Sequence, residues 1–313
     1  SIIHHLLSSN VLPIGKIQSI HPEWNPLFII WSSFIFFAGS AVVTGDIKTW
    51  ELIPTGYLNI ERNEDNYGGF SGIDISDDGL TILMITDKSF FFQLSLIRDQ
   101  NQNLTDFSIL RDGRLLSSKG EFLDKRNTDS ESLVRDSNGF YFISFESNNR
   151  VMKHENIDGK AKFLERHGDF KKLGSNKGIE ALAIDKHNRL IAIPEKPPKG
   201  KSLLPIYRYE KDNWSLIKEI EINNDFLVTG AEFISDDKLL LLERKFSWTN
   251  GFKSRFRLLS LGFFGNNEPK IIFTSNPNQF DNLEGLAIWN DIKGNKRVIT
   301  VSDDNFHPLQ RSE

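Results

Sequence analysis

Glu180 to Glu195 have the sequence EALAIDKHNRLIAIPE, in which a polar turn separates two short apolar runs. Each run is too short for an ordinary helix, and charged residues bound the stretch at both ends. The turn Lys186-His187-Asn188 contains an asparagine, a residue that tolerates the left-handed backbone of a tight hairpin. The stretch therefore predicts a β-hairpin that begins and ends with a glutamate.

The same pattern occurs four more times, as an apolar strand, a polar turn, a second apolar strand and a closing acid. The other four segments are Gly69–Asp87 (GFSGIDISDDGLTILMITD), Glu131–Glu146 (ESLVRDSNGFYFISFE), Gly230–Glu243 (GAEFISDDKLLLLE) and Glu284–Asp303 (EGLAIWNDIKGNKRVITVSD). Their closing acids are separated by 48 to 60 residues. A repeat of about 50 residues with one hairpin in each unit is typical of a β-propeller blade.

We therefore predict an all-β fold, a β-propeller built from blades of four antiparallel strands. The stretches between the hairpins supply outer strands, for example Pro205–Tyr209 and Ser215–Ile222, whereas Gln100–Asn103 and Glu195–Ser202 are polar and predicted to be loops. Five units are visible, and Thr49–Ile60 offers strand material for another. Six blades is the favoured prediction, with five or seven as alternatives.

The composition is that of a soluble globular protein and excludes several classes of function. Of 313 residues, 39% are hydrophobic and 26% are charged. The net charge of −4 gives no bulk positive field for nucleic acid, so we expect no nucleic-acid partner and a monomer. The absence of cysteine excludes disulfides, thiolate catalysis and thiolate metal sites.

One apolar run without charge lies near the start, Leu27–Val43, LFIIWSSFIFFAGSAVV. It is short for a membrane span, and its small residues Ala38–Ala41 are typical of a signal cleavage site. The alternatives are an uncleaved membrane anchor or a buried strand. We predict residues 1–45 to be a signal-like or anchor-like segment and 46–313 to be the propeller. A signal or an anchor predicts a periplasmic or secreted protein, with membrane contact only through this anchor.

The closing acids gain significance from hairpin geometry, because a hairpin brings the start of its first strand beside the end of its second. If these hairpins are the inner strands of successive blades, their acids meet at one mouth of the central channel. Two units depart from the pattern, because Ser71 replaces the opening acid in the first and Thr229 or Gly230 stands there in the fourth. The acids predicted as metal ligands are Asp87, Glu131, Glu146, Glu180, Glu195, Glu243, Glu284, Asp303 and Asp304.

Carboxylates this close repel one another, and a bound cation or a shared proton offsets that repulsion. Ligands that are all oxygen suit a hard cation, Ca²⁺ above all or Mg²⁺. Among the acids, Glu180, Glu195 and Asp303 are the candidate catalytic residues. Arg244, Lys196 and Lys88 alternate with the acids and are the candidate phosphate-binding residues. The alternative is that acids at strand ends are solvated or bond to the backbone of the next blade.

Common catalytic motifs are absent from the sequence. Ser71 lies in Gly69-Phe70-Ser71-Gly72, which lacks the glycine spacing of the serine-hydrolase elbow. The sequence also has no His-Glu-x-x-His zinc motif and no P-loop.

Short motifs spread over roughly Tyr57–Gln310 resemble the bacterial phytase-like family that is named for esterase-like activity. They are GGFSGI (68–73), TD (86–87), ESL (131–133), FE (145–146), GIEALA (178–183), Glu195, LER (242–244), LEGLA (283–287), and VSDDNF (301–306) with Gln310. The family commonly has Asp-Pro-Glu-Gly where this chain has Asp129-Ser130-Glu131-Ser132.

The resemblance implies a propeller exported by Gram-negative bacteria and similar to alkaline phytases, in which bound Ca²⁺ organises phosphate hydrolysis. The first hypothesis is a Ca²⁺-dependent hydrolase acting on a small phosphate ester outside the cytoplasm. The alternatives are a non-enzymatic binding propeller with a structural metal and a lactonase-like Ca²⁺ esterase. Arg244 favours a phosphate substrate and the nearby Phe246 and Trp248 favour an apolar one, so the sequence leaves these hypotheses open.

Overall fold

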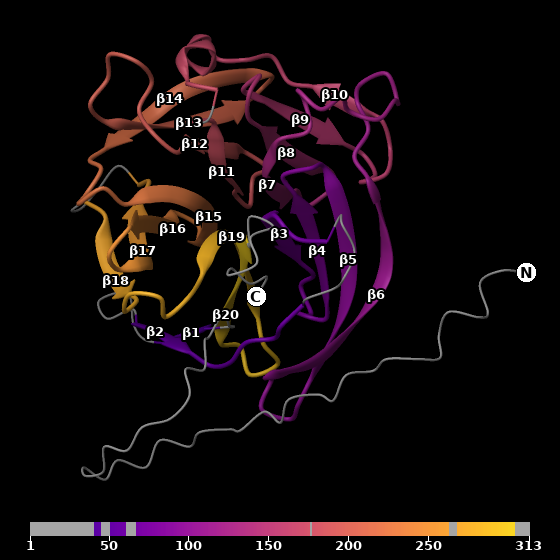
Figure 1. Cartoon of the computed structure of the whole chain (residues 1–313), viewed down its shortest axis with the longest axis vertical. Coiled ribbons are helices and arrows are strands. Elements are labelled where there is room, and N and C mark those ends of the chain that lie inside the picture. Colours follow the sequence, from indigo (N-terminus) through magenta and orange to yellow (C-terminus); the bar gives the residue numbers. More distant parts are fainter. Residues whose placement is uncertain (1–40, 45–50, 61–66, 176, 263–267, 304–313) are drawn as a thin grey trace, which may run out of the picture. The chain divides into compact units, whose positions relative to one another are not determined.

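The computed structural model describes residues 41–44, 51–60, 67–175, 177–262 and 268–303. The chain separates into two units, Ser1–Ile35 and Phe36–Glu313, and the first lies wholly outside the described residues. The second contains five four-stranded antiparallel sheets (Figure 1). Each sheet is one blade of a β-propeller, which confirms the predicted all-β class and the four-stranded blades.

Strands follow one another from the inside of each blade to its outside, except in the last blade. Blade 1 contains β3 (Phe70–Ile75), β4 (Thr81–Thr86), β5 (Phe90–Arg98) and β6 (Leu104–Arg114); blade 2 contains β7 (Ser130–Arg135), β8 (Tyr141–Phe145), β9 (Arg150–His154) and β10 (Ala161–Phe163). Blade 3 contains β11 (Ile179–Ile184), β12 (Leu190–Pro194), β13 (Leu204–Glu210) and β14 (Asn213–Ile220); blade 4 contains β15 (Leu227–Ser235), β16 (Lys238–Ser247), β17 (Gly251–Ser260) and β18 (Lys270–Thr274). Blade 5 contains β19 (Asn282–Asn290), β20 (Lys296–Asp303), β1 (Ala41–Thr44) and β2 (Glu51–Pro54).

The predicted hairpins are the inner strand pairs β3–β4, β7–β8, β11–β12, β15–β16 and β19–β20. The inner strands β3, β7, β11, β15 and β19 contact one another in this order, and β19 contacts β3 again. The described part of the chain therefore closes a ring of five blades, which matches the alternative of five and not the favoured number of six. The stretch expected to form another blade instead contributes β2, the outermost strand of blade 5.

Blade 5 is assembled from both ends of the described chain. Strand β1 pairs with β20, with Val42 opposite Arg297, and β2 pairs with β1. Ala41–Thr44 therefore belongs to the sheet, although the predicted signal or anchor included it. Residues 1–40, which hold the rest of that apolar segment, lie outside the described residues. Among the residues that are described, no helix is long and apolar enough to cross a membrane.

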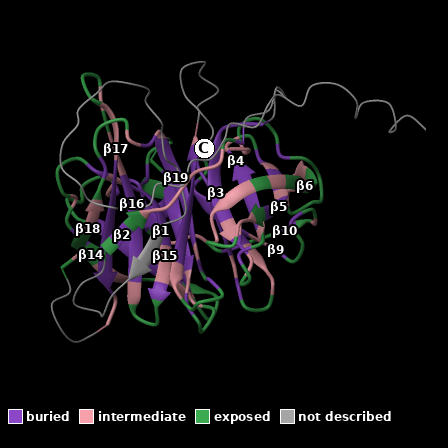
Figure 2. Ribbon diagram, turned by 90° about the horizontal axis from the view of Figure 1, so that it is seen from below, coloured by how far each residue is buried: buried purple, intermediate pink, exposed green. Residues whose placement is uncertain are grey.

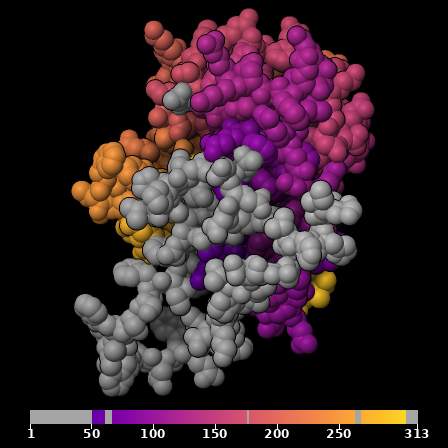
Figure 3. Space-filling model, turned by 45° about the vertical axis from the view of Figure 1, so that its right-hand side comes forward, coloured from indigo at the N-terminus to yellow at the C-terminus, as the bar shows by residue number. Residues whose placement is uncertain are grey.

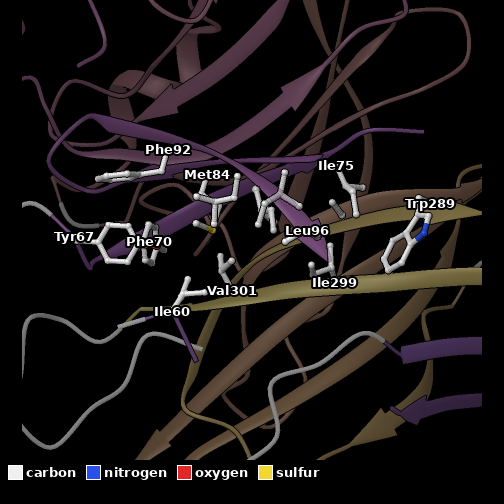
Figure 4. Close-up of a cluster of buried hydrophobic side chains, with 14 residues drawn as sticks. Ile60, Tyr67, Phe70, Ile75, Met84, Phe92, Leu96, Trp289, Ile299 and Val301 are labelled. Carbon is white, nitrogen blue, oxygen red and sulfur yellow. The ribbon is translucent and has the colours of Figure 1, made fainter. Parts of the chain in front are cut away.

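Five buried hydrophobic clusters lie between successive blades. Figure 4 shows the cluster between blades 5 and 1, with Tyr67, Phe70 and Phe92 gathered at one end and Trp289 at the other. The ring centroids of Tyr67 and Phe92 are 4.8 Å apart in an edge-to-face arrangement. Removal of these side chains from water is the main force that holds neighbouring blades together. Figure 3 shows blades 1 and 2, indigo to rose, meeting along one face of the molecule.

The turns of three inner hairpins share one stabilising device. The Oδ1 atom of Asp136 accepts the N–H groups of Asn138 and Phe140, and Asp185 and Asp291 make the equivalent pair of bonds in blades 3 and 5. These aspartates favour the tight turn and hold the hairpin in register. They lie at the end of the hairpins opposite to the acids described next. The structured connection before blade 3 contains a short 3-10 helix, Gly168–Lys172.

Candidate metal centre at the channel mouth

Each inner strand contains a β-bulge at the same position near its start. The pairing of inner and second strands skips one residue between Phe70 and Gly72, and it skips the equivalent residue in blades 2, 3 and 4; in blade 5 it skips two. A bulge releases its extra residue from the regular alternation and re-aims its side chain. The skipped residues are Ser71, Glu131, Glu180, Thr229, and Glu284 with Gly285.

The bulges explain why the residue that follows is small in every blade. These residues are Gly72, Ser132, Ala181, Gly230 and Gly285. A Cβ atom on Gly72 would lie 2.8 Å from the backbone nitrogen of Leu133, and one on Gly285 would lie 3.1 Å from the Cα of Gly72. Neighbouring inner strands therefore approach to backbone contact, which brings the bulged residues of different blades together.

A second set of residues lies at the end of the second strand of each blade, where backbone hydrogen bonds and strand register define equivalent positions. In blade 1 the N–H of Asp87 donates to the carbonyl of Gly69, two residues before the bulge. Glu146 and Glu195 make the same bond in blades 2 and 3. In blades 4 and 5 the register pairs Leu227 with Arg244 and Asn282 with Asp303. The equivalent closing residues are therefore Asp87, Glu146, Glu195, Arg244 and Asp303.

Glu243 is thus one residue away from the position that the sequence assigned to it. Side chains alternate between the faces of a strand, so a shift of one residue points the side chain to the other face. Its carboxylate is fully buried, with Oε2 2.6 Å from Nη2 of Arg255 and Oε1 2.5 Å from Nη2 of Arg257. Two arginines therefore already satisfy this carboxylate, and the structure does not bring Glu243 together with the other predicted ligands.

The remaining predicted acids of the described chain do converge. Carboxylate oxygens of Asp129, Glu131 and Glu146 lie within 4.8 Å of one another. The Glu146 Oε1 atom accepts the N–H of Gly178 at 2.5 Å. Glu146 also lies beside Glu180, and Asp129 beside Glu131, so that one carboxyl of each pair can donate to the other when it is protonated. Three carboxylates within this distance can hold one hard cation.

On the far side of the cluster, Arg244 is the only cation among the ten bulge and closing positions. Its Nη1 lies 2.9 Å from Glu284 Oε1, and its Nη2 lies 3.7 Å from Glu195 Oε1. Asn282 accepts a hydrogen bond from Arg244 at 2.5 Å and donates to Glu284 at 2.8 Å and to Asp303 at 3.4 Å. Lys196 follows Glu195 in the chain, and its Nζ lies 3.6 Å from Oε2 of Glu195. Lys88 stands beside Asp87 in the corresponding turn of blade 1.

The acids of the mouth outnumber its single arginine, and this excess of negative charge helps to raise their pKa values. Burial raises the pKa of Glu131 and Glu180 well above the usual range of a carboxyl, and the charges of neighbouring carboxylates raise it further. Burial likewise raises the pKa of Glu284 to about 7, although Arg244 acts against it. The pKa of Asp87 rises to about 7 through burial and the charge of Asp303. The protein alone therefore leaves this negative charge under-compensated.

Two observations show that the residues fit a hard cation. The donor set is made of carboxylate oxygens, which Ca²⁺ prefers. In addition, the Oδ1 atom of Asp87 is buried without a hydrogen-bond partner among the described residues. A buried carboxylate oxygen without a donor is costly, and a cation would satisfy it.

Two residues of the cluster were not predicted from the sequence as site residues. Asp129 lies two residues before Glu131, and Asn282 lies two residues before Glu284. A spacing of two puts side chains on the same face of a strand, so this pattern was available as a signal. Asp304 was predicted as a ligand but lies outside the described residues.

Another acid, Glu232, is half-buried and lies apart from this cluster, on the inner strand of blade 4. Burial raises the pKa of Glu232 to about 8, and the charge of Asp74 in blade 1 adds to the shift. A carboxyl whose folded pKa exceeds its unfolded value of 4.5 stabilises the fold only while it is protonated, so stability falls as pH rises from about 4.5 through about 8.

We expect Glu232→Gln to raise stability above pH 8 by about 1 to 3 kcal/mol, because glutamine stays neutral. Urea unfolding at pH 5 and pH 9 measures this effect, which should vanish at pH 5. The exposed Glu155→Gln is the matched control and should show no such pH dependence. Equal stability of Glu232→Gln and the parent protein at pH 9 would contradict the assignment.

Comparisons with known proteins gave similar solved structures and one family. One similar solved structure is that of U3-55K, with a TM-score of 0.43 and 9% sequence identity; the match covers 79% of this chain and 62% of that one. Another is hydrazine synthase of Kuenenia stuttgartiensis, with a TM-score of 0.41 and 12% identity; the match covers 82% of this chain and 83% of that one. Virginiamycin B lyase of Staphylococcus aureus is also similar, with a TM-score of 0.39 and 11% identity; the match covers 78% of this chain and 97% of that one. At these identities and TM-scores the likenesses carry no argument about function.

A sequence search of curated proteins found no match. The family comparison is more informative, because residues 65–306 match the description "Phytase-like: Esterase-like activity of phytase". This range covers most of the chain and contains every bulge and closing residue of the five blades. The chain therefore belongs to the phytase-like family.

Proposed function

We propose that the channel mouth binds Ca²⁺ and hydrolyses a small phosphate ester. The observation that supports this most is the convergence of carboxylates at the mouth, where three from blade 2 have oxygens within 4.8 Å of one another and Arg244 lies beside Glu284 of blade 5. Family membership is consistent with a hydrolase that acts on esters.

Each residue of the mouth has a distinct task in this proposal. Asp129, Glu131 and Glu146 would hold the ion, and Asp87 and Asp303 would complete a neighbouring oxygen-rich region. Bound Ca²⁺ would neutralise the phosphate and lower the pKa of a water that it holds. Glu180 or Glu195 would accept the proton of the attacking water, since both are buried beside the cluster.

Arg244 and the lysines supply the part of the site that binds phosphate. Guanidinium groups form paired hydrogen bonds with phosphate oxygens, and lysines act as point charges. Arg244 is held in place by Glu284 and Asn282, so its orientation does not depend on a substrate. Lys196 and Lys88 border the mouth from blades 3 and 1.

We expect Arg244→Lys to lower kcat/KM for a phosphate monoester about tenfold or more, because lysine cannot make the paired bonds. The effect on a carboxylic ester of the same alcohol should be much smaller. The matched control is Arg189→Lys, which changes an arginine paired with Asp185 at the opposite end of the blade 3 hairpin.

Steady-state assays with and without a calcium chelator test the proposal. Hydrolysis that is lost on chelation and restored by Ca²⁺, and preference for phosphate over carboxylic esters, would support it. Calcium-dependent hydrolysis of lactones or carboxylic esters alone would favour the esterase alternative.

A second candidate function is a binding propeller in which the ion is structural. It is favoured by the origin of the ligands, because Glu131 and Glu180 come from different blades and an ion between them would cross-link the ring. This candidate predicts calcium-dependent stability without calcium-dependent hydrolysis of any ester.

A further inference from the structure

Blade 4 extends a β-hairpin beyond its closing residue, which blades 1 to 3 do not. In blades 1 and 2 the second and third strands are joined directly after the closing acid, through residues 87–89 and 146–149. In blade 3 the connection is the polar loop 195–203. In blade 4, β16 continues past Arg244 to Ser247, and β17 starts at Gly251.

Because β16 runs on past Arg244, the extension projects from the same end of the propeller as the metal centre; Figure 2 shows an exposed loop at the end of β17. Strand β15 starts opposite Arg244, so beyond this residue β16 pairs only with β17. Trp248 is four residues further along the chain, which at strand spacing is about 13 Å beyond Arg244. The hairpin tip, residues 245–253, therefore stands clear of blade 4.

Three aromatic side chains form the end of this hairpin. Trp248 is 95% exposed and Phe246 is 49% exposed. The ring centroids of Phe246 lie 5.2 Å from Trp248 and 4.9 Å from Phe252. Such a group of exposed aromatic residues at a protruding tip costs solubility and marks an interaction surface.

The tip is held in one conformation by neighbouring loops. The N–H of Phe252 donates to Oδ1 of Asn278, and the N–H of Asn278 donates to the carbonyl of Phe252. Gly251 has a φ of 67°, and a Cβ atom there would collide with the Asn278 side chain. Lys245 donates from its Nζ to the carbonyl of Asn224 at 2.9 Å. The aromatic residues are thus presented on a supported hairpin.

The shape and chemistry of the tip select its partner. Small molecules bind in concave sites, whereas this surface is convex and needs a partner that closes around it. Tryptophan and phenylalanine favour the interfacial region of a bilayer, and lysines beside them can extend their ammonium groups to headgroup phosphates. Lys253 lies opposite Lys245 in the hairpin register, next to the aromatic residues, and it is the lysine that can do so, because Lys245 is held by Asn224 and Asp225. The net charge of −4 and the acidic mouth disfavour an anionic surface.

We propose that the hairpin tip inserts Trp248 and Phe246 into a zwitterionic lipid surface, which brings the channel mouth to the level of the headgroups. This site consists of residues 245–253 and does not depend on the proposed hydrolase activity. On insertion the indole ring of Trp248 leaves water for the lipid, and no residue of the metal centre moves.

Flotation of the full chain with phosphatidylcholine vesicles tests this proposal. We expect Trp248→Ser to lower the partition coefficient about tenfold or more, because most of the buried apolar area is lost. The control is Ile292→Ser, which removes an 81% exposed apolar residue from the β19–β20 turn at the opposite end. It should leave the partition coefficient unchanged.

A second measurement isolates Trp248 from the other tryptophans and from the N-terminal segment. The emission of the parent protein minus that of Trp248→Phe is the emission of Trp248 alone. We expect this difference spectrum to shift to shorter wavelength and to be quenched by bromine-labelled phosphatidylcholine. A difference spectrum that stays unshifted and unquenched at saturating lipid, or equal partition of Trp248→Ser and the parent, would overturn the proposal.

Discussion

Replacing Glu243 with glutamine is expected to lower the free energy of unfolding by about 3 to 5 kcal/mol. Arg255 and Arg257 lie 2.6 and 2.5 Å from its two carboxylate oxygens, and all three side chains are buried. Glutamine keeps the shape of the side chain but leaves two arginines without a counter-charge in the interior. The large cost comes from this uncompensated charge, since an intact buried triad adds little net stability.

Denaturant unfolding of Glu243→Gln measures the effect, and Asp225→Asn is the matched control. Asp225 pairs with Lys245 at 3.3 Å, but its side chain is 90% exposed, so the same change there should cost less than about 1 kcal/mol. Folded Glu243→Gln should still bind Ca²⁺ as the parent does, because its carboxylate lies away from the mouth. Weakened calcium affinity with unchanged stability would reverse this assignment.

Replacing Glu180 with glutamine is expected to have the opposite profile. Calcium affinity should fall about ten- to a hundredfold, because the change removes a charge beside the ligands and the carboxyl partner of Glu146. Without calcium the variant should be at least as stable as the parent, because glutamine is neutral without the proton that the buried Glu180 carboxyl must take up on folding. Thermal unfolding of both proteins with and without Ca²⁺ checks both signs.

The exposed Glu155→Gln is the control for this second prediction. Its melting temperature should rise on calcium addition as much as that of the parent protein. Loss of stability in calcium-free Glu180→Gln, together with an undiminished calcium response, would show that Glu180 has only a structural role.

Hairpin positions were predictable because their signals are local. Alternating apolar runs and turn residues mark each inner hairpin, and the repeat of these signals gives the propeller. The number of blades was not predictable in the same way. Blade 5 depends on pairing between Val42 and Arg297, which are far apart in the sequence. No local pattern states that β1 and β2 share a sheet with β19 and β20.

The acidic mouth was predictable in outline. The prediction for Glu243 differs from the structure by one residue of strand register. Acids close the second strand in four blades, so Glu243 looked equivalent in the fourth. The true equivalent is Arg244, because the pairing of β15 with β16 puts it opposite Leu227. A difference of one residue exchanges the two faces of a strand, and the sequence of β16 alone does not reveal which residue the bulge aligns.

The bulges explain why the mouth can be built from such different segments. Each inner strand uses its extra residue to present a side chain, and small residues after it let the strands approach. Where this position is Ser71 or Thr229, its hydroxyl bonds to the next blade, to the carbonyl of Ser130 or Leu283. The same backbone feature therefore serves either blade contact or the acidic cluster, according to the side chain.

Calorimetric titration of the full chain with Ca²⁺ tests the central claim, that the mouth is a metal centre, most directly. We expect saturable heat, a higher melting temperature, and release of protons, detected as a dependence of the heat on the buffer. Protons should leave because burial and neighbouring charges hold them on Glu131 and Glu180 until the cation replaces them. Absence of saturable heat at millimolar calcium, with an unchanged melting temperature, would contradict the claim.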